Sequence, residues 1–244
     1  MNRVALKPAV GAFLRHPSKA AFIAAAAEDL AVRLAEAVDL RGAAVMALAG
    51  GKTPEPVYAE LGKRDLAWAK VTATLTDERF VPPTSPQSNA GLLARSLFAG
   101  PGCVCGFIPL WRDVATAAEA ADLADQRLAS LEAPFDVVVL GVGDDGHTAS
   151  LFPHAPELAV GLNPAASRKV IAVAPGAPAP FEARLSLTLP AILNARAILV
   201  LAAGPDKLRV LEAALAGENA NAMPIRAVLH QTRVPVVIHW SPEA

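Results

Sequence analysis

The first long pattern in the chain is an apolar stripe near its N-terminus. Between Ser18 and Arg41, apolar side chains recur four residues apart, at Phe22, Ala26, Leu30, Leu34 and Val38. This spacing places one apolar face on a helix, and Ser18 is suited to be its N-cap. We therefore predict an amphipathic helix whose apolar face covers a sheet.

Short apolar runs that contain β-branched residues follow this helix, and they are typical of strands that are buried on both faces. They occupy residues 43–49, 71–76, 135–140, 170–173, 197–202 and 234–239. Helix-like segments alternate with them, at 54–61, 88–98, 114–131 and 206–216. Such alternation predicts right-handed βαβ units, and hence an α/β fold with a mostly parallel sheet and helices on both faces. We predict one domain over 1–244, with a surface excursion at 153–180 where Pro, Gly and Ala are abundant.

Charge and apolar content narrow the classes of partner. The 22 basic and 23 acidic residues leave no positive excess for a nucleic-acid backbone or an anionic membrane. The apolar stretch 20–27 is interrupted at once by Glu28 and Asp29, so neither a membrane span nor export is predicted. Cys103 and Cys105, one residue apart, suit neither a loop-closing disulfide nor a zinc site. We predict free thiols and a cytoplasmic protein.

Residues just beyond the carboxyl ends of parallel strands line the ligand site in open α/β sheets. Gly50, Gly51, Lys52 and Thr53 hold this position after the run 43–49 and precede a predicted helix. Bare amides and the positive end of the helix dipole make this loop a candidate phosphate cradle. A plain glycine-rich turn into a helix explains the same residues. The spacing is not that of a nucleotide-binding P-loop, so ATP or GTP is not predicted.

Three charged residues, Asp77, Glu78 and Arg79, end the run 71–76. One interpretation is a solvated loop in which these ions pair with one another. Their place at the carboxyl end of a buried strand favours a ligand site instead.

The densest group of reactive residues follows the run 135–140. Asp145 and His147 lie there in a segment bounded by glycines, 141–153. An imidazole held by a carboxylate takes a proton from water and returns it to a leaving group. We therefore predict His147 as a general base that Asp145 orients. The sequence has no His/Cys spacing suited to a metal, so a side chain is expected to activate water.

Two further cations stand near apolar runs. Lys207 lies in the first turn of a predicted helix, where its charge opposes the helix dipole, so a bound anion would explain its placement. An exposed lysine that extends into solvent explains it equally well. Arg184 lies beside an apolar run, 185–189.

Five segments, in chain order, resemble 6-phosphogluconolactonases: 48–54, 76–83, 141–153, 184–189 and 204–207. The most specific is 145–153, Asp-Gly-His-Thr-Ala-Ser-Leu-Phe-Pro, which resembles the family signature residue for residue. The resemblance covers nearly the whole chain. It implies the fold of glucosamine-6-phosphate deaminase and ribose-5-phosphate isomerase.

The implied reaction is hydrolysis of 6-phospho-D-glucono-1,5-lactone to 6-phosphogluconate in the oxidative pentose phosphate pathway. No cofactor is implied, and the expected partner is the phosphorylated sugar lactone alone, bound by a monomer or small homo-oligomer. By resemblance, His147 is the general base, Asp145 its partner, and Arg184 and Lys207 the phosphate ligands. The implied substrate-binding residues are Gly50, Gly51, Thr53, Asp77, Arg79, Arg184 and Lys207. Lys52 departs from the family, which more often carries Ser there.

Two alternatives use the same residues. In an aldose-ketose isomerase or deaminase of this fold, Asp77 would act on a substrate C–H while His147 helped to open the ring. The segment 148–152, Thr-Ala-Ser-Leu-Phe, opposes this, because deaminases usually continue with Ile-Ala-Phe-Asn-Glu. A non-catalytic sugar-phosphate sensor is the other alternative, but the chain offers no separate DNA-binding segment.

Overall fold

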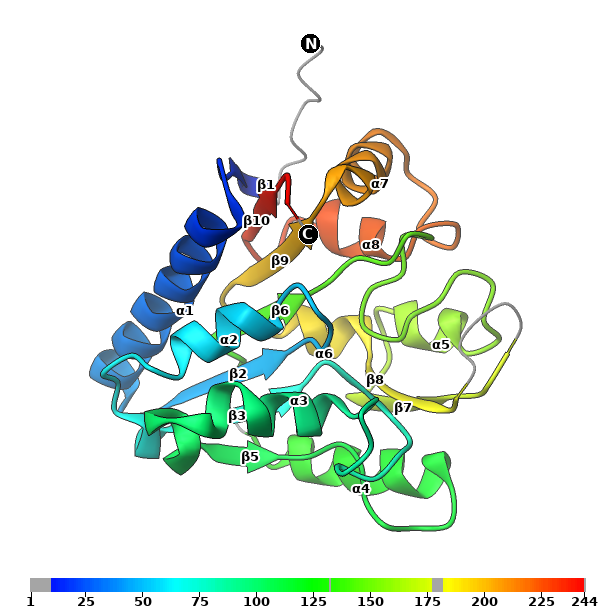
Figure 1. The fold of residues 1–244 in the computed structure, drawn as a ribbon. Helices are drawn as coiled ribbons and strands as arrows, with labels where there is room; N and C mark the ends of the chain where they lie inside the picture. Colours follow the sequence, from blue (N-terminus) through cyan, green and yellow to red (C-terminus); the bar gives the residue numbers. More distant parts are fainter. Residues whose placement is uncertain (1–9, 132, 177–181, 244) are drawn as a thin grey trace.

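The computed structural model describes residues 10–131, 133–176 and 182–243. Its main sheet has seven strands in the order β1-β10-β9-β6-β2-β3-β5, and every neighbouring pair is parallel (Figure 1). The strands are β1 (Val10–Arg15), β2 (Ala44–Leu48), β3 (Val71–Leu75), β5 (Gly106–Ile108), β6 (Val137–Leu140), β9 (Ile198–Ala203) and β10 (Val236–Ser241). The predicted α/β class with a mostly parallel sheet is confirmed.

A second, three-stranded antiparallel sheet lies beside the main one, in the order β4-β8-β7. It consists of β4 (Asp77–Arg79), β7 (Val170–Val173) and β8 (Arg184–Leu187). The run 170–173 is a strand with the predicted bounds, but it pairs in this antiparallel sheet and not in the main parallel one. A four-residue apolar run shows that a strand is buried but not which strand it pairs with. For the charged triplet 77–79, one interpretation was a solvated loop. The triplet instead forms the short strand β4.

The helices are α1 (Lys19–Arg41), α2 (Glu55–Leu61), α3 (Asn89–Arg95), α4 (Ala117–Ala129), α5 (Leu158–Leu162), α6 (Leu189–Leu193), α7 (Pro205–Ala216) and α8 (Ile225–Leu229). The predicted first helix is confirmed, because the Ser18 hydroxyl accepts from the Ala21 amide at 3.2 Å. Gly42 ends it with a φ of 79°. The excursion contains α5 and β7, while its part at 177–180 lies outside the described residues. Within the described segments, no helix has the length and apolarity to cross a bilayer.

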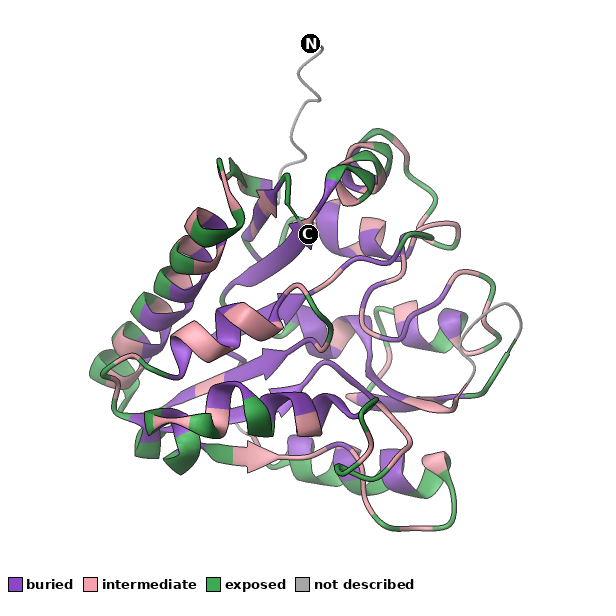
Figure 2. Cartoon of the chain, in the orientation of Figure 1, coloured by how far each residue is buried: buried purple, intermediate pink, exposed green. Residues whose placement is uncertain are grey.

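The core lies between the main sheet and the helices packed on it. Every residue of β6 is fully buried, and the central strands form the buried centre of Figure 2. Helix α1 contacts β2, β6 and β10, and its small buried residues Ala26 and Ala27 allow a close approach. This packing fixes the strands whose carboxyl ends carry the polar loops.

The strand order reverses beside β2. The chain runs from β2 outward to β3 and β5, and then returns to β6 on the other side of β2 before continuing to β9 and β10. In open α/β sheets, ligands bind outside the carboxyl ends of the strands at such a reversal point. The topology therefore places a crevice where β2 and β6 end.

Candidate active site

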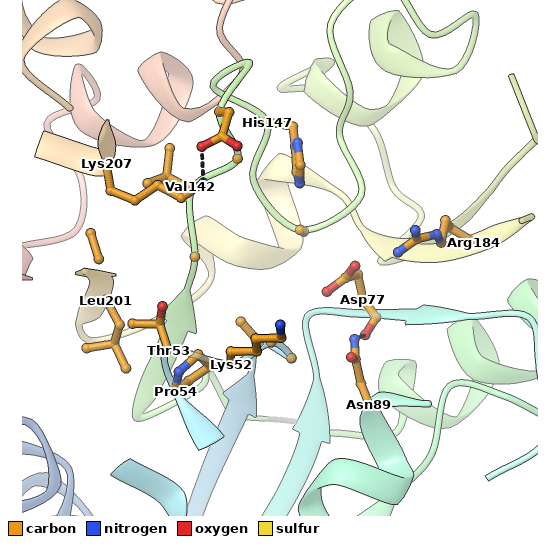
Figure 3. A pocket seen from close by; sticks show the side chains of 18 of the residues that line it. Lys52, Thr53, Pro54, Asp77, Asn89, Val142, His147, Arg184, Leu201 and Lys207 are labelled. Atoms are coloured by element: carbon orange, nitrogen blue, oxygen red, sulfur yellow. Dashed lines mark hydrogen bonds and ion pairs between the residues drawn. The ribbon is translucent and has the colours of Figure 1, made fainter. Parts of the chain in front are cut away.

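A cavity of about 310 Å³ opens at these carboxyl ends. It is bordered by the loops that follow β2 and β6, by the strand β4, by the end of β9 and by the start of α7, which supply most of the side chains in Figure 3. Every residue predicted for the site lines this cavity except Asp145. Sequence positions as distant as 50 and 207 are thus brought together because parallel strands end at one edge of the sheet.

Asp145 lies behind His147 and holds its ring. Its Oδ1 is 2.6 Å from His147 Nδ1 and accepts from the His147 amide at 3.0 Å. Burial alone would raise the pKa of Asp145, but these hydrogen bonds from His147 outweigh it, so the pKa is lowered below 3.8. The ionised carboxylate therefore orients Nδ1 and leaves Nε2 for the cavity.

The turn that carries Asp145 and His147 depends on glycines and on unusual backbone angles. A Cβ on Gly143 would lie 2.1 Å from His147 Nδ1, so only glycine leaves room for the ring. Gly146 has a φ of 80°, and Ala149, which is not a glycine, has a φ of 48°. Non-glycine residues in this left-handed region are often strained and gather at functional sites.

Phe152 forms an aromatic wall behind the reactive side chains. Its ring centroid is 4.5 Å from that of His147. The Arg184 guanidinium carbon lies 5.9 Å from the same centroid, within the range of a cation–π contact. Phe152, which is 5% exposed, therefore packs against both His147 and Arg184.

Asp77 is a buried carboxylate that faces the cavity. It is 8% exposed, and its Oδ2 accepts from the Ser150 hydroxyl at 2.7 Å. The Ser150 amide in turn donates to the Ser186 hydroxyl of β8 at 3.1 Å. The small sheet and the turn after β6 are thereby joined at Asp77.

Glu78 points away from the cavity and anchors the start of α3. Its carboxylate accepts from the Ser88 hydroxyl at 3.0 Å and from the amides of Arg79, Asn89 and Ala90 at 2.8 Å each. Burial raises the pKa of Glu78, although these donors partly offset the effect. Its task is structural.

Asn89 links three parts of the site. Its side-chain amide donates to the Asp77 carbonyl at 2.8 Å, and its Oδ1 accepts from Arg79 Nη1 at 3.1 Å. A Cβ on Gly50 would lie 1.8 Å from that oxygen. Gly50 is therefore required for the close approach of the Asn89 side chain, whether or not it also meets a phosphate.

Lys207 does not extend freely into solvent. Its Nζ lies 2.6 Å from Asp144 Oδ1, and its side chain is 26% exposed. Asp144 is 84% exposed. Because the carboxylate is exposed, an incoming anion can replace it on Lys207.

Arg79 and Arg184 face one another across the small sheet. They are directly paired in the antiparallel register of β4 and β8. Like charges in this arrangement repel each other. Burial and the neighbouring Arg79 charge lower the pKa of Arg184, while Asp77 acts in the opposite sense.

The cations occupy two separate sides of the cavity. We define the loop side by Gly50, Gly51, Lys52, Thr53 and Lys207, and the arginine side by Asp77, Arg79 and Arg184. Figure 3 shows Lys207 and Thr53 on one side and Arg184 on the other, with His147 between them. The residues predicted to form one phosphate site all line this one cavity.

Sequence reasoning missed Asn89, Ser150 and Phe152 as parts of the site. Asn89 stands directly after the helix cap Ser88 and was taken for the start of a helix. Ser150 and Phe152 belong to the signature-like segment, but only the fold brings them to Asp77 and Arg184. The described part of the chain contains no cluster of three His, Cys, Asp or Glu side chains suited to a metal. Both cysteines are free.

A family model described as glucosamine-6-phosphate isomerases/6-phosphogluconolactonase matches residues 17–239. The 6-phosphogluconolactonase of Pseudomonas putida is 45% identical over 217 residues, covering 88% of this chain and 87% of that protein. The 6-phosphogluconolactonase of Rhizobium meliloti is 43% identical over 219 residues, covering 89% of this chain and 93% of that protein.

A solved structure is also similar to this chain over most of its length. The crystal structure of a 6-phosphogluconolactonase from Shewanella baltica matches with a TM-score of 0.90 and 37% identity, covering 94% of this chain and 97% of that chain. All the loops that line the cavity lie within the matched family region.

Proposed function

The chain belongs to the glucosamine-6-phosphate isomerase/6-phosphogluconolactonase family, and we propose that it hydrolyses 6-phospho-D-glucono-1,5-lactone to 6-phosphogluconate. The observation that carries this proposal is the pair Asp145–His147 at the edge of a cavity with cations on both sides. This arrangement suits an uncharged reacting carbonyl that is attached to an anionic anchor.

His147 acts as the general base. Asp145 accepts from Nδ1, so Nε2 takes a proton from water as the water oxygen bonds to the lactone carbonyl carbon. The carbonyl oxygen becomes an oxyanion in the tetrahedral intermediate. When the intermediate collapses, the bond from this carbon to the ring oxygen breaks, and the ring oxygen takes the proton from His147. The product is the open-chain acid.

The phosphate is anchored on the loop side. Lys52 and Lys207 supply two positive charges there, and Thr53 supplies a hydroxyl beside the glycine amides. Gly51, with a φ of 108°, adopts a backbone conformation that favours glycine. These donors are suited to a dianion. The phosphate displaces the exposed Asp144 from Lys207. Asp77 and Arg79 then face the sugar.

The proposed setting is the oxidative pentose phosphate pathway in the cytoplasm. Two free cysteines suit a reducing compartment. The Asp145–His147 pair and the cations on both sides of the cavity all come from this chain.

The experiment is to follow acid release from freshly generated 6-phosphogluconolactone. The wild type should exceed the spontaneous rate, and His147→Ala should lower kcat about 10²- to 10⁴-fold because it removes general-base assistance. His154→Asn is a matched control: His154 is exposed in the same loop region, and Asn tolerates its φ of 63°. A wild type no faster than the spontaneous reaction would overturn the function. An active wild type matched by His147→Ala would overturn the role of His147.

A further inference from the structure

Arg184 differs from Lys207 in how its donors are used. Lys207 donates to Asp144, whereas the Nε of Arg184 is buried without a hydrogen-bond partner. Arg79 also has an unpaired Nε, but its Nη1 donates to Asn89 and to the Gln87 carbonyl. Buried N–H groups are nearly always paired, and exceptions call for an explanation. The Nε groups of Arg64, Arg112 and Arg226 also lack a partner, but of these arginines only Arg79 and Arg184 line the cavity.

Phe152 fixes where Arg184 stands. The guanidinium lies over the ring that also packs against His147, at 5.9 Å from the same centroid. The cation and the imidazole therefore share one wall of the cavity. Figure 3 shows Lys207 on the opposite side, beyond His147. Arg184 thus belongs with the residue that activates water.

The arginine side holds a buried carboxylate beside its two arginines, whereas the carboxylate near the loop side, Asp144, is exposed. The buried carboxylate of Asp77 acts directly on Arg184, and its side chain is only 8% exposed. A bound phosphate dianion would face this carboxylate at close range, where burial strengthens the repulsion. A single negative charge that forms only during the reaction is repelled less by Asp77, and only while that charge exists. Asp77 meanwhile suits the hydroxyl groups of a sugar as an acceptor.

We propose that Arg184 is a catalytic residue that donates to the lactone carbonyl oxygen, and that it does not hold the phosphate. The inference rests on the function proposed above. As water adds to the carbonyl carbon and its proton passes to His147, the π electrons of the C=O bond move to oxygen. Arg184 stabilises that oxyanion by a charge-assisted hydrogen bond. Collapse returns the electrons, expels the ring oxygen and releases the hydrogen bond.

The test is steady-state hydrolysis of 6-phosphogluconolactone by Arg184→Met and Arg184→Lys, beside Lys207→Met. Loss of one oxyanion donor typically lowers kcat about 10²- to 10³-fold. We expect that fall in Arg184→Met, with KM and the inhibition constant of inorganic phosphate nearly unchanged. Lys207→Met should show the reverse, a raised KM with kcat largely kept. Arg168→Met is the control, because Arg168 pairs with Asp122 outside the cavity.

A second measurement separates chemistry from folding. Added guanidinium ion should restore part of kcat to Arg184→Ala and leave the kcat of Lys207→Met unchanged. Should Arg184→Met or Arg184→Ala fail to fold, Arg184→Lys keeps the charge but changes the donor geometry, so its kcat should still fall while KM holds. Raised KM and weaker phosphate inhibition with kcat retained, in either Arg184 variant, would overturn the inference and assign Arg184 to the phosphate. An inactive wild type would instead overturn the proposed function itself.

Discussion

The two sides of the cavity are built differently. On the arginine side, Asp77 and Arg184 stand on paired strands, and Ser150 and Phe152 hold them through buried contacts. On the loop side, Lys207 at the start of α7 pairs with the exposed Asp144, and the other members belong to a glycine-rich turn. Rigid placement matters most where bonds break, whereas a phosphate tolerates adjustable partners. The difference indicates that the donor to the carbonyl oxygen belongs with the strands of the arginine side and the phosphate anchor with the loop side, while His147 stands between them on the turn after β6.

The largest effect that tests this comparison is expected from a change confined to the turn that positions His147. In Gly143→Ala, the new Cβ would lie 2.1 Å from His147 Nδ1 and 2.6 Å from Asp145 Oδ1. Displacing a catalytic group by about 1 Å can cost about 100-fold in rate, so we expect kcat to fall about that far while KM holds. Steady-state lactone hydrolysis measures both.

Gly141→Ala provides the control, since a Cβ at Gly141 would meet nothing within 4 Å. It should retain most of the activity. If Gly143→Ala kept wild-type kcat, or if both variants lost activity equally, the fixed geometry of the Asp145–His147 pair would not be what the reaction requires.

A smaller effect concerns the acid that holds the imidazole. The pKa of Asp145 is lowered in the fold, since hydrogen bonds from His147 outweigh the raising effect of burial. Its ionised form therefore adds stability above the ordinary pKa of 3.8, and this contribution is lost as pH falls through the lowered value. Because the side chain is 46% exposed, solvent screens much of the effect.

We accordingly expect Asp145→Asn to lower Tm by at most about 2–4 °C at pH 7, the shift typical of about 1 kcal/mol in a chain of this size. Thermal unfolding of the variant and the wild type should converge as pH falls below the lowered pKa of Asp145. Asp113→Asn, at an exposed position, is the control. A gap between Asp145→Asn and wild type that widens as pH falls would contradict this interpretation.

Much of the fold followed from periodicity alone. The stripe on α1 and its Ser18 cap were legible because 23 residues repeat the pattern, and the buried parallel strands stood out as apolar runs. The short helices could not be predicted in this way. Helices α5, α6 and α8 have five residues each, too few to show a helical period. The edge strand β1 was also missed, since its mixed burial gives no continuous apolar run.

The site was predicted to the level of residues but not of their arrangement. Strand ends and the signature-like segment identified His147, Asp77 and Lys207 as neighbours, because topology alone brings strand ends together. The division of the cations between two sides was not predictable. It depends on the antiparallel pairing of β4 with β8, which places Arg184 opposite Arg79, and short strands carry no signal for their partner.

The central claim is that the loop side anchors a phosphate while His147, between the two sides, performs the chemistry. The most direct test is the ratio of kcat/KM for 6-phosphogluconolactone to that for unphosphorylated gluconolactone, in the wild type and in Lys207→Met. Charge-assisted contacts to a dianion are each worth about 1.5–3 kcal/mol, so we expect the wild type to prefer the phosphorylated lactone at least about 100-fold. Lys207→Met should lose about a factor of ten or more of that preference while still hydrolysing the bare lactone. Equal kcat/KM for the two lactones in the wild type would contradict the account.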